Sequence, residues 1–129
     1  MARAALAAAR AARRVTLDLA SAQDIERYGA ERFSSLVREL GADLIFANEA
    51  ERAAVPRLTA PAWVLKRGAR GAVFPEGAFP AVPTSATDTT GAGDALAAGY
   101  LVGGPALAMA AAARCVAQAG AMPAAPGAP

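Results

Sequence analysis

Short apolar segments alternate with longer amphipathic or alanine-rich segments along most of the chain. The short segments contain the β-branched and aromatic residues typical of strands, and they lie at 15–19, 43–47, 62–66 and 71–74. The longer segments predict helices at 2–14, at 22–40 with Gly29 as a break, and from 48 onward. Strands that alternate with helices, with polar clusters at strand ends, predict an α/β fold that binds ligands at the carboxyl edge of its sheet.

The second half of the chain contains more glycine and proline. Residues 67–70 form a predicted turn between two strands, and residues 79–83 are a predicted edge strand because prolines there donate no backbone N–H. An alanine-rich helix should follow residue 91, and Pro105 should start a last helix that ends at about Gly120. We therefore expect one partial domain over residues 1–121, followed by a Pro/Ala-rich tail over 122–129.

The length and composition of the chain exclude several classes of function. The chain has 129 residues, enough for one modest domain, and much of its 55% hydrophobic content is alanine, so we expect a thin core. The chain has 13 basic and 11 acidic residues, which are interleaved after position 17, so we predict no nucleic-acid binding. Histidine is absent and Cys115 is the single cysteine, which excludes histidine chemistry and an intrachain disulfide. A cytoplasmic protein is the default expectation.

Residues 95–113 carry no charge and are nominally long enough to cross a bilayer. Gly103, Gly104 and Pro105 interrupt this segment, and most of its residues are alanine or glycine. Two packed helices of a soluble protein explain the segment better, so we predict no membrane partner.

Candidate chemistry is concentrated in residues 84–100. Gly91, Ala92 and Gly93 lack side-chain bulk, so their backbone N–H groups can turn toward a phosphate, aided by the N-terminus of the following helix. Asp94 then falls in the first helical turn, where its carboxylate can accept a proton from an attacking hydroxyl. The Walker A pattern and the dinucleotide pattern do not fit, the latter because Leu96 occupies its last glycine position. The alternative is structural: Asp94 offsets the helix dipole, and Asp88 or Thr90 caps the helix.

The run Asp88-Thr89-Thr90-Gly91-Ala92-Gly93-Asp94, followed by Ala98-Gly99, closely resembles the C-terminal signature of the ribokinase-like (PfkB) carbohydrate kinases. The resemblance implies a partial ribokinase-like three-layer α/β fold, namely the C-terminal portion of the sheet with its flanking helices. It also implies that Asp94 is the catalytic base and that Gly91, Ala92 and Gly93 form the anion hole. In potassium-dependent members, the positions of Asp88 and Thr90 help to form a monovalent cation site. A brace within the loop is the alternative role for this pair.

Two further segments resemble the same family. Asn48-Glu49-Ala50-Glu51 is similar to its Asn-x-x-Glu element, in which the positions of Asn48 and Glu51 hold hydrated Mg²⁺. A helix N-cap followed by a first-turn acid is the alternative. Residues 64–72 resemble the strand-turn-strand that borders the nucleotide, with Gly68 and Gly71 at the family spacing and Lys66 as a candidate phosphate contact or a solvated charge.

The resemblance implies an ATP-dependent sugar kinase that uses Mg²⁺ and, in potassium-dependent members, K⁺. The sugar-binding half of such kinases, with its di-glycine motif, has no counterpart in this sequence. The alternative is a non-catalytic nucleotide-binding fragment or subunit of a split or truncated kinase, which pairs with a second chain or with itself. A third hypothesis is a structural α/β module in which the phosphate cradle is fortuitous.

Overall fold

The computed structural model describes residues 2–85 and 87–118, which divide into two compact units after Lys66. The first unit contains α1 (Ala2–Ala11), β1 (Thr16–Asp18), α2 (Ala22–Tyr28), α3 (Ala30–Leu40), β2 (Leu44–Asn48), α4 (Glu49–Ala54) and β3 (Ala62–Lys66). The second contains a 3₁₀ turn, η1 (Gly68–Arg70), followed by β4 (Ala72–Phe74), β5 (Gly77–Phe79) and α5 (Ala92–Val116). Strands and helices alternate in the first unit, as the apolar pattern predicts.

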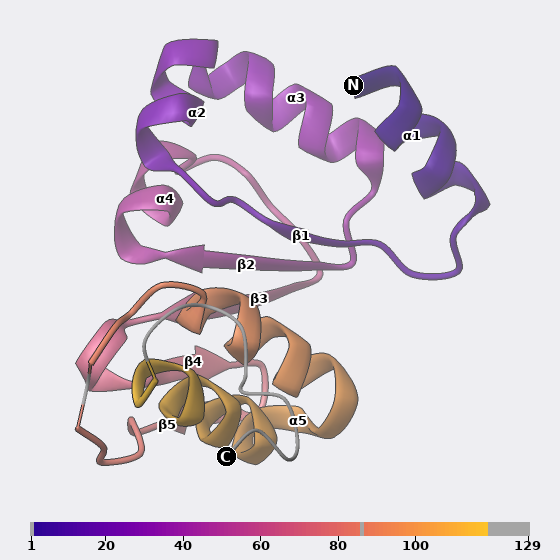
Figure 1. Cartoon of the computed structure of the whole chain (residues 1–129). Helices are drawn as coiled ribbons and strands as arrows, with labels where there is room; N and C mark the ends of the chain where they lie inside the picture. Colours follow the sequence, from indigo (N-terminus) through magenta and orange to yellow (C-terminus); the bar gives the residue numbers. More distant parts are fainter. Residues whose placement is uncertain (1, 86, 119–129) are drawn as a thin grey trace. The chain divides into compact units, whose positions relative to one another are not determined.

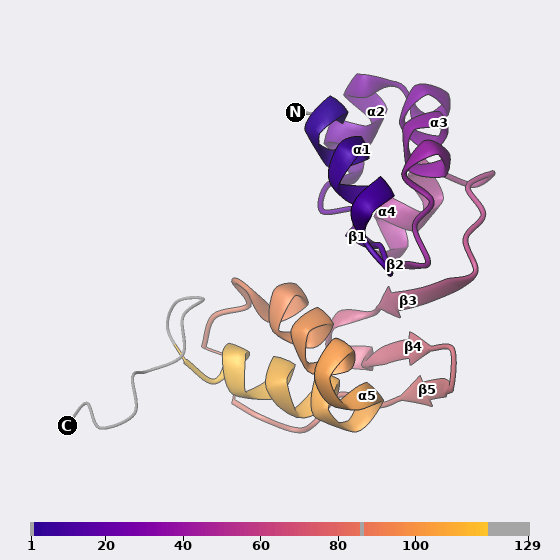
Figure 2. The same ribbon diagram turned by 90° about the vertical axis from the view of Figure 1, so that its right-hand side faces the viewer.

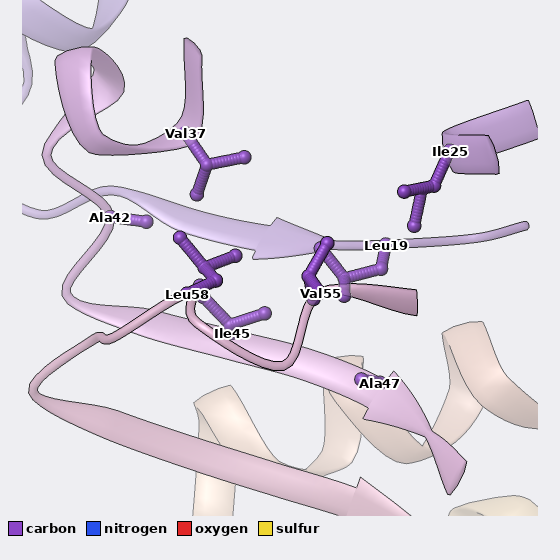
Figure 3. Close-up of a cluster of buried hydrophobic side chains, with 8 residues drawn as sticks. All are labelled: Leu19, Ile25, Val37, Ala42, Ile45, Ala47, Val55 and Leu58. Carbon is purple, nitrogen blue, oxygen red and sulfur yellow. The ribbon is translucent and has the colours of Figure 1, made fainter. Parts of the chain in front are cut away.

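The first unit is a parallel sheet with helices on one face. β2 pairs in parallel with β1 and with β3, and α2, α3 and α4 lie on the same side of these strands (Figures 1 and 2). The apolar cluster between helices and sheet, shown in Figure 3, consists of Leu19, Ile25, Val37, Ala42, Ile45, Ala47, Val55 and Leu58. Because the strands are parallel, their carboxyl ends meet at one edge, where Asp18, Asn48 and Lys66 are the last strand residues.

Glycines and a capping serine set the helix boundaries in this unit. Gly29, with φ 98°, separates α2 from α3, and Gly41 ends α3 in the left-handed conformation. Ser21 caps α2 by accepting a hydrogen bond from the backbone N–H of Asp24. The predicted break and stop are confirmed, whereas the first helix ends at Ala11 rather than at residue 14.

The second unit begins with a small antiparallel pair. β4 pairs with β5, the rings of Phe74 and Phe79 meet edge to face, and Phe74 also stacks on Tyr100 of α5. The predicted edge strand at 79–83 is therefore wrong, since the strand ends at Phe79 instead of starting there. Pro80, directly after it, has no N–H to extend the ladder.

α5 consists of two helical halves. Gly103 and Gly104 have non-helical backbone angles, and the halves before and after them lie side by side (Figures 1 and 2). The predicted pair of helices is confirmed, but the second half ends at Val116 and not at about Gly120. The predicted tail lies outside the described residues. By length and composition α5 could cross a membrane. The break leaves two halves that are each shorter than the roughly 20 residues a spanning helix needs.

Candidate functional site

The N-terminus of α5 has no side-chain cap, and an anion would bind to N–H groups of this kind. The helix begins at Ala92 after Gly91, which has a left-handed φ of 78° and provides no side-chain cap. The N–H groups of Gly93 and Asp94, in the first turn, lie too early in the helix to reach a helical acceptor. The N–H of Ala92 does have a partner, because it donates to the Thr89 carbonyl at 3.2 Å. Of the three predicted anion-hole amides, the Ala92 N–H thus already donates a hydrogen bond within the loop.

Asp94 lies in the first turn of α5, as predicted, and its side chain is exposed. Within residues 2–85 and 87–118, its carboxylate makes no hydrogen bond or ion pair. Such a carboxylate, in the first turn of a helix, can accept a proton from a bound hydroxyl.

The alternative of a capped helix is wrong for Asp88 and Thr90. Asp88 Oδ1 accepts a hydrogen bond from the N–H of Thr90 at 2.8 Å, inside the loop, and not from an N–H of the helix. The pair therefore braces the loop that precedes α5, which is the structural alternative to the predicted cation site. A monovalent cation at these residues stays a prediction.

The second half of α5 holds this loop in place. The Val116 carbonyl accepts hydrogen bonds from the N–H groups of Thr87 and Asp88, at 2.7 and 3.2 Å. The buried Cys115 thiol contacts the Thr90 carbonyl at 3.3 Å. No spacing in the sequence indicates these contacts, because they join residues that are 25 to 29 positions apart in the chain.

In the first unit, Asn48 and Glu51 form a reciprocal cap at the start of α4. Asn48 Oδ1 accepts from the Glu51 N–H at 2.9 Å, while the two Glu51 oxygens accept from the Asn48 backbone N–H at 2.8 Å and from Asn48 Nδ2 at 2.7 Å. The N-cap alternative is thus confirmed as a structural role. Each of these oxygens keeps a lone pair for a further partner.

Glu51 is only 3% exposed as a residue, and all partners of its carboxyl group in the described chain are neutral. Buried charge of this kind favours a nearby cation. The described residues contain no group of three or more acidic or sulfur side chains that could hold a metal ion. Mg²⁺ retains most of its water when it binds to a protein. Asn48 and Glu51 therefore fit an outer-shell role toward a hydrated ion.

Lys66 is already paired within its unit. Its Nζ contacts Asp18 Oδ1 at 2.9 Å and Oδ2 at 2.7 Å, and the two side chains are 17% and 26% exposed. Lys66 is thus not the solvated charge of the alternative prediction. The sequence analysis did not assign Asp18 to the site, although an acid at the end of a predicted parallel strand was the signal that could have found it.

Gly68 and Gly71 differ in the space that a side chain would have at each position. Gly68, with φ 57°, is exposed with open space where a Cβ would stand. Gly71, with φ 89°, is buried, and a Cβ there would lie 2.0 Å from the Phe79 carbonyl oxygen. Close packing therefore explains glycine at position 71, and nucleotide contacts at both positions stay a prediction.

No model of a known protein family matches the sequence. The structure resembles adenosine kinase from Schistosoma mansoni in complex with 2-fluoroadenosine, with a TM-score of 0.79 over 96% of this chain at 16% identity. It also resembles ribokinase from Thermotoga maritima (TM-score 0.63, 90% of this chain, 23% identity) and fructokinase from Vibrio cholerae with fructose, ADP and calcium (0.56, 84%, 24%). The chain has part of the ribokinase-like fold. It spans about half of each structure, 49%, 47% and 46% in turn, so the predicted partial ribokinase-like fold is confirmed.

Proposed function

We propose that the chain is the ATP-binding and catalytic-base portion of a ribokinase-like sugar kinase, which transfers the γ-phosphoryl group of ATP to a carbohydrate hydroxyl. The observation that carries the proposal is the Asp94 carboxylate, which has no partner among residues 2–85 and 87–118 and lies in the first turn of a helix whose N-cap residue makes no side-chain hydrogen bond. The kinases that share the fold support the reaction class, and the fructokinase contains both fructose and ADP.

Asp94 accepts the proton of the acceptor hydroxyl as its oxygen attacks the γ-phosphorus. The bond between that phosphorus and the bridging oxygen breaks, and ADP leaves with the bonding electron pair. The amides of Gly91, Ala92 and Gly93, together with the helix dipole, stabilise negative charge on the transferred group. Since phosphoryl transfer depends mainly on positioning and electrostatics, the chain needs no nucleophile of its own.

In the first unit, Asn48 and Glu51 would hold hydrated Mg²⁺ in the second coordination shell, through its water molecules. When bound, this ion neutralises phosphate charge. Lys66 would contact a phosphate oxygen, and Gly68 and Gly71 would border the nucleotide. Asp88 and Thr90 would hold K⁺ in a potassium-dependent enzyme. The protein would act in the cytoplasm.

The test is ADP release by the purified chain with MgATP and K⁺ against pentoses, hexoses, sugar phosphates and nucleosides. Asp94→Asn should lower kcat by roughly 10³-fold, with nucleotide affinity nearly unchanged, because the base acts only in the transition state. Asp24→Asn is the matched control, since Asp24 is also an exposed first-turn acid, in α2. Equal turnover by Asp94→Asn and the wild type would remove the proposed base.

We also propose a second candidate function for this part of the fold, since the chain spans about half of each structure it resembles. On this proposal the chain binds nucleotide but needs a sugar-binding partner, either a separate chain or a second copy. It predicts MgATP binding without ADP release from any acceptor in the panel. ADP formation abolished by Asp94→Asn would reject it.

A further inference from the structure

Asp18 and Lys66 reach toward each other across the middle strand of the parallel sheet. Asp18 is in register with Phe46 of β2, which in turn is in register with Val64, two residues before Lys66 on β3. Because side chains alternate along a strand, Val64 and Lys66 point to the same face as Asp18. The ion pair therefore passes over β2 at the carboxyl edge, where Asn48 is the register partner of Lys66.

Among the described residues, the hydrogen bonds of this pair leave one Lys66 N–H donor without an acceptor. Asp18 Oδ1 accepts from Lys66 Nζ and also from the N–H of Ala20 at 3.0 Å, while within residues 2–85 and 87–118 Oδ2 accepts from Lys66 alone. An ammonium group has three N–H donors, so a third remains for another acceptor. With 17% of its side chain exposed, Lys66 is reachable from solvent.

Asp18 also supports the turn that follows β1. Ala20 has a φ of 63°, a left-handed conformation that costs energy for a residue with a Cβ. The hydrogen bond from Ala20 to Asp18 Oδ1 helps to hold this conformation. One carboxylate thus fixes both a strained turn and the ammonium group of a long, flexible side chain.

We propose that Asp18 is a positioning residue for nucleotide binding: it holds the Lys66 ammonium at the carboxyl edge with one N–H left for a phosphate oxygen of MgATP. A lysine that is already held loses less side-chain freedom when the phosphate binds. This inference rests on the proposed function, because it names how one residue of the nucleotide site is held.

Three variants separate this role from a merely structural one. Asp18→Asn keeps Oδ1 for the Ala20 N–H but loses the charge that faces Lys66, and Lys66→Met removes the ammonium at similar length. The third variant combines both. Asp43→Asn is the control, since Asp43 is an acid of the same unit that accepts a backbone N–H, from Val15, at the opposite end of β1.

Calorimetric titration of the full chain with MgATP gives the first readout. Asp18→Asn should weaken binding about fivefold and Lys66→Met about tenfold, as expected for loss of charge-assisted hydrogen bonds. In the double variant the effect of Asp18→Asn should disappear, because Asp18 acts through Lys66. If the affinity losses of the two single variants add fully in the double variant, Asp18 acts on the structure alone, and the inference is overturned.

The second readout uses the fact that Lys66 is the sole lysine of the chain. Acetylation by an amine reagent, followed by mass spectrometry, therefore reports Lys66 separately from the N-terminal amine. Saturating MgATP should slow acetylation of Lys66 in the wild type, and Asp18→Asn should react faster without nucleotide. Unchanged acetylation of the wild type under saturating MgATP would overturn the inference even if Asp18→Asn failed to fold.

The two proposals fail in different ways. A wild-type chain that is folded but binds no MgATP overturns the proposed function, and the role of Asp18 with it. A wild type that binds MgATP no more tightly than Asp18→Asn overturns the role of Asp18 alone.

Discussion

Glu51 lies at the carboxyl edge of the parallel sheet at a position that is 3% exposed. Its carboxyl group accepts hydrogen bonds from Asn48 in the first turn of α4, and its partners in the described chain are neutral. A hydrated cation beside Glu51 would balance the charge of its carboxylate, since the water molecules of the cation can donate hydrogen bonds to the remaining lone pairs.

Glu51→Gln should therefore weaken the dependence of nucleotide binding on Mg²⁺. The variant keeps one carbonyl oxygen for the Asn48 backbone N–H but removes the charge, so we expect about a fivefold higher Mg²⁺ concentration for half-maximal ATP binding. A titration of ATP binding with Mg²⁺ measures this concentration. Glu49→Gln, an exposed first-turn acid of the same helix, should change it little, and equal shifts in both variants would argue against a specific role for Glu51.

Single residues show where sequence reasoning succeeds and where it stops. Asn48 and Glu51 are three positions apart, so their contact follows from local helix geometry and was readable as a cap. Asp18 and Lys66 are 48 positions apart, and only the strand order and register bring them together. Pairing between distant charges is therefore the part of the site that the sequence alone does not reveal.

At the scale of elements, α5 depends on close contact between its two halves. A Cβ on Gly99 would lie 2.8 Å from the Ala108 Cα and from the Leu107 carbonyl oxygen, which are backbone atoms of the facing half. Because backbone atoms cannot rotate away, the halves must separate to admit even a methyl group. The second half also holds the loop before α5, because the carbonyl of Val116 accepts hydrogen bonds from Thr87 and Asp88.

Gly99→Ala should lower the free energy of unfolding by about 1–3 kcal/mol and loosen the loop in front of Asp94. Denaturant unfolding measures the first effect, and amide hydrogen exchange at Thr87 and Asp88 measures the second. Gly103→Ala is the matched control, because its Cβ would meet the flexible end of the Leu107 side chain. If Gly99→Ala lowers the free energy of unfolding no more than Gly103→Ala does, tight packing at Gly99 is contradicted.

Most helices and strands were predictable because the residues that mark their ends lie close to them in the sequence. Glycines at 29, 41 and 103–104 marked a break, a stop and a kink at the observed places. β5 was misplaced because the apolar run that suggested a strand begins at its last residue, Phe79. The close contact of Gly99 with the facing half of α5 has no sequence signal, since any helical alanine-rich segment can contain a glycine.

At the scale of the whole molecule, the chain carries its candidate nucleotide residues in both units, with Asn48, Glu51 and Lys66 in the first and Asp94 in the second. It also spans only about half of the kinases it resembles. The kinase and the non-catalytic subunit both bind nucleotide, whereas a structural module with a fortuitous cradle does not. Nucleotide binding by the intact chain is therefore the property that decides whether the site has any function.

MgATP should raise the melting temperature of the chain, because a ligand that binds only the folded state stabilises it. At a hundred times Kd the gain is about 2.7 kcal/mol, which corresponds to a rise of several degrees. Thermal unfolding with MgATP, with MgCl₂ alone and with ATP plus a chelator measures the effect. Asp94→Asn should keep the full rise, because the base acts in the transition state, whereas Lys66→Met should lose much of it. A rise equal to that with MgCl₂ alone would reject nucleotide binding and leave the structural module, while a full rise without ADP release would favour the subunit over the enzyme.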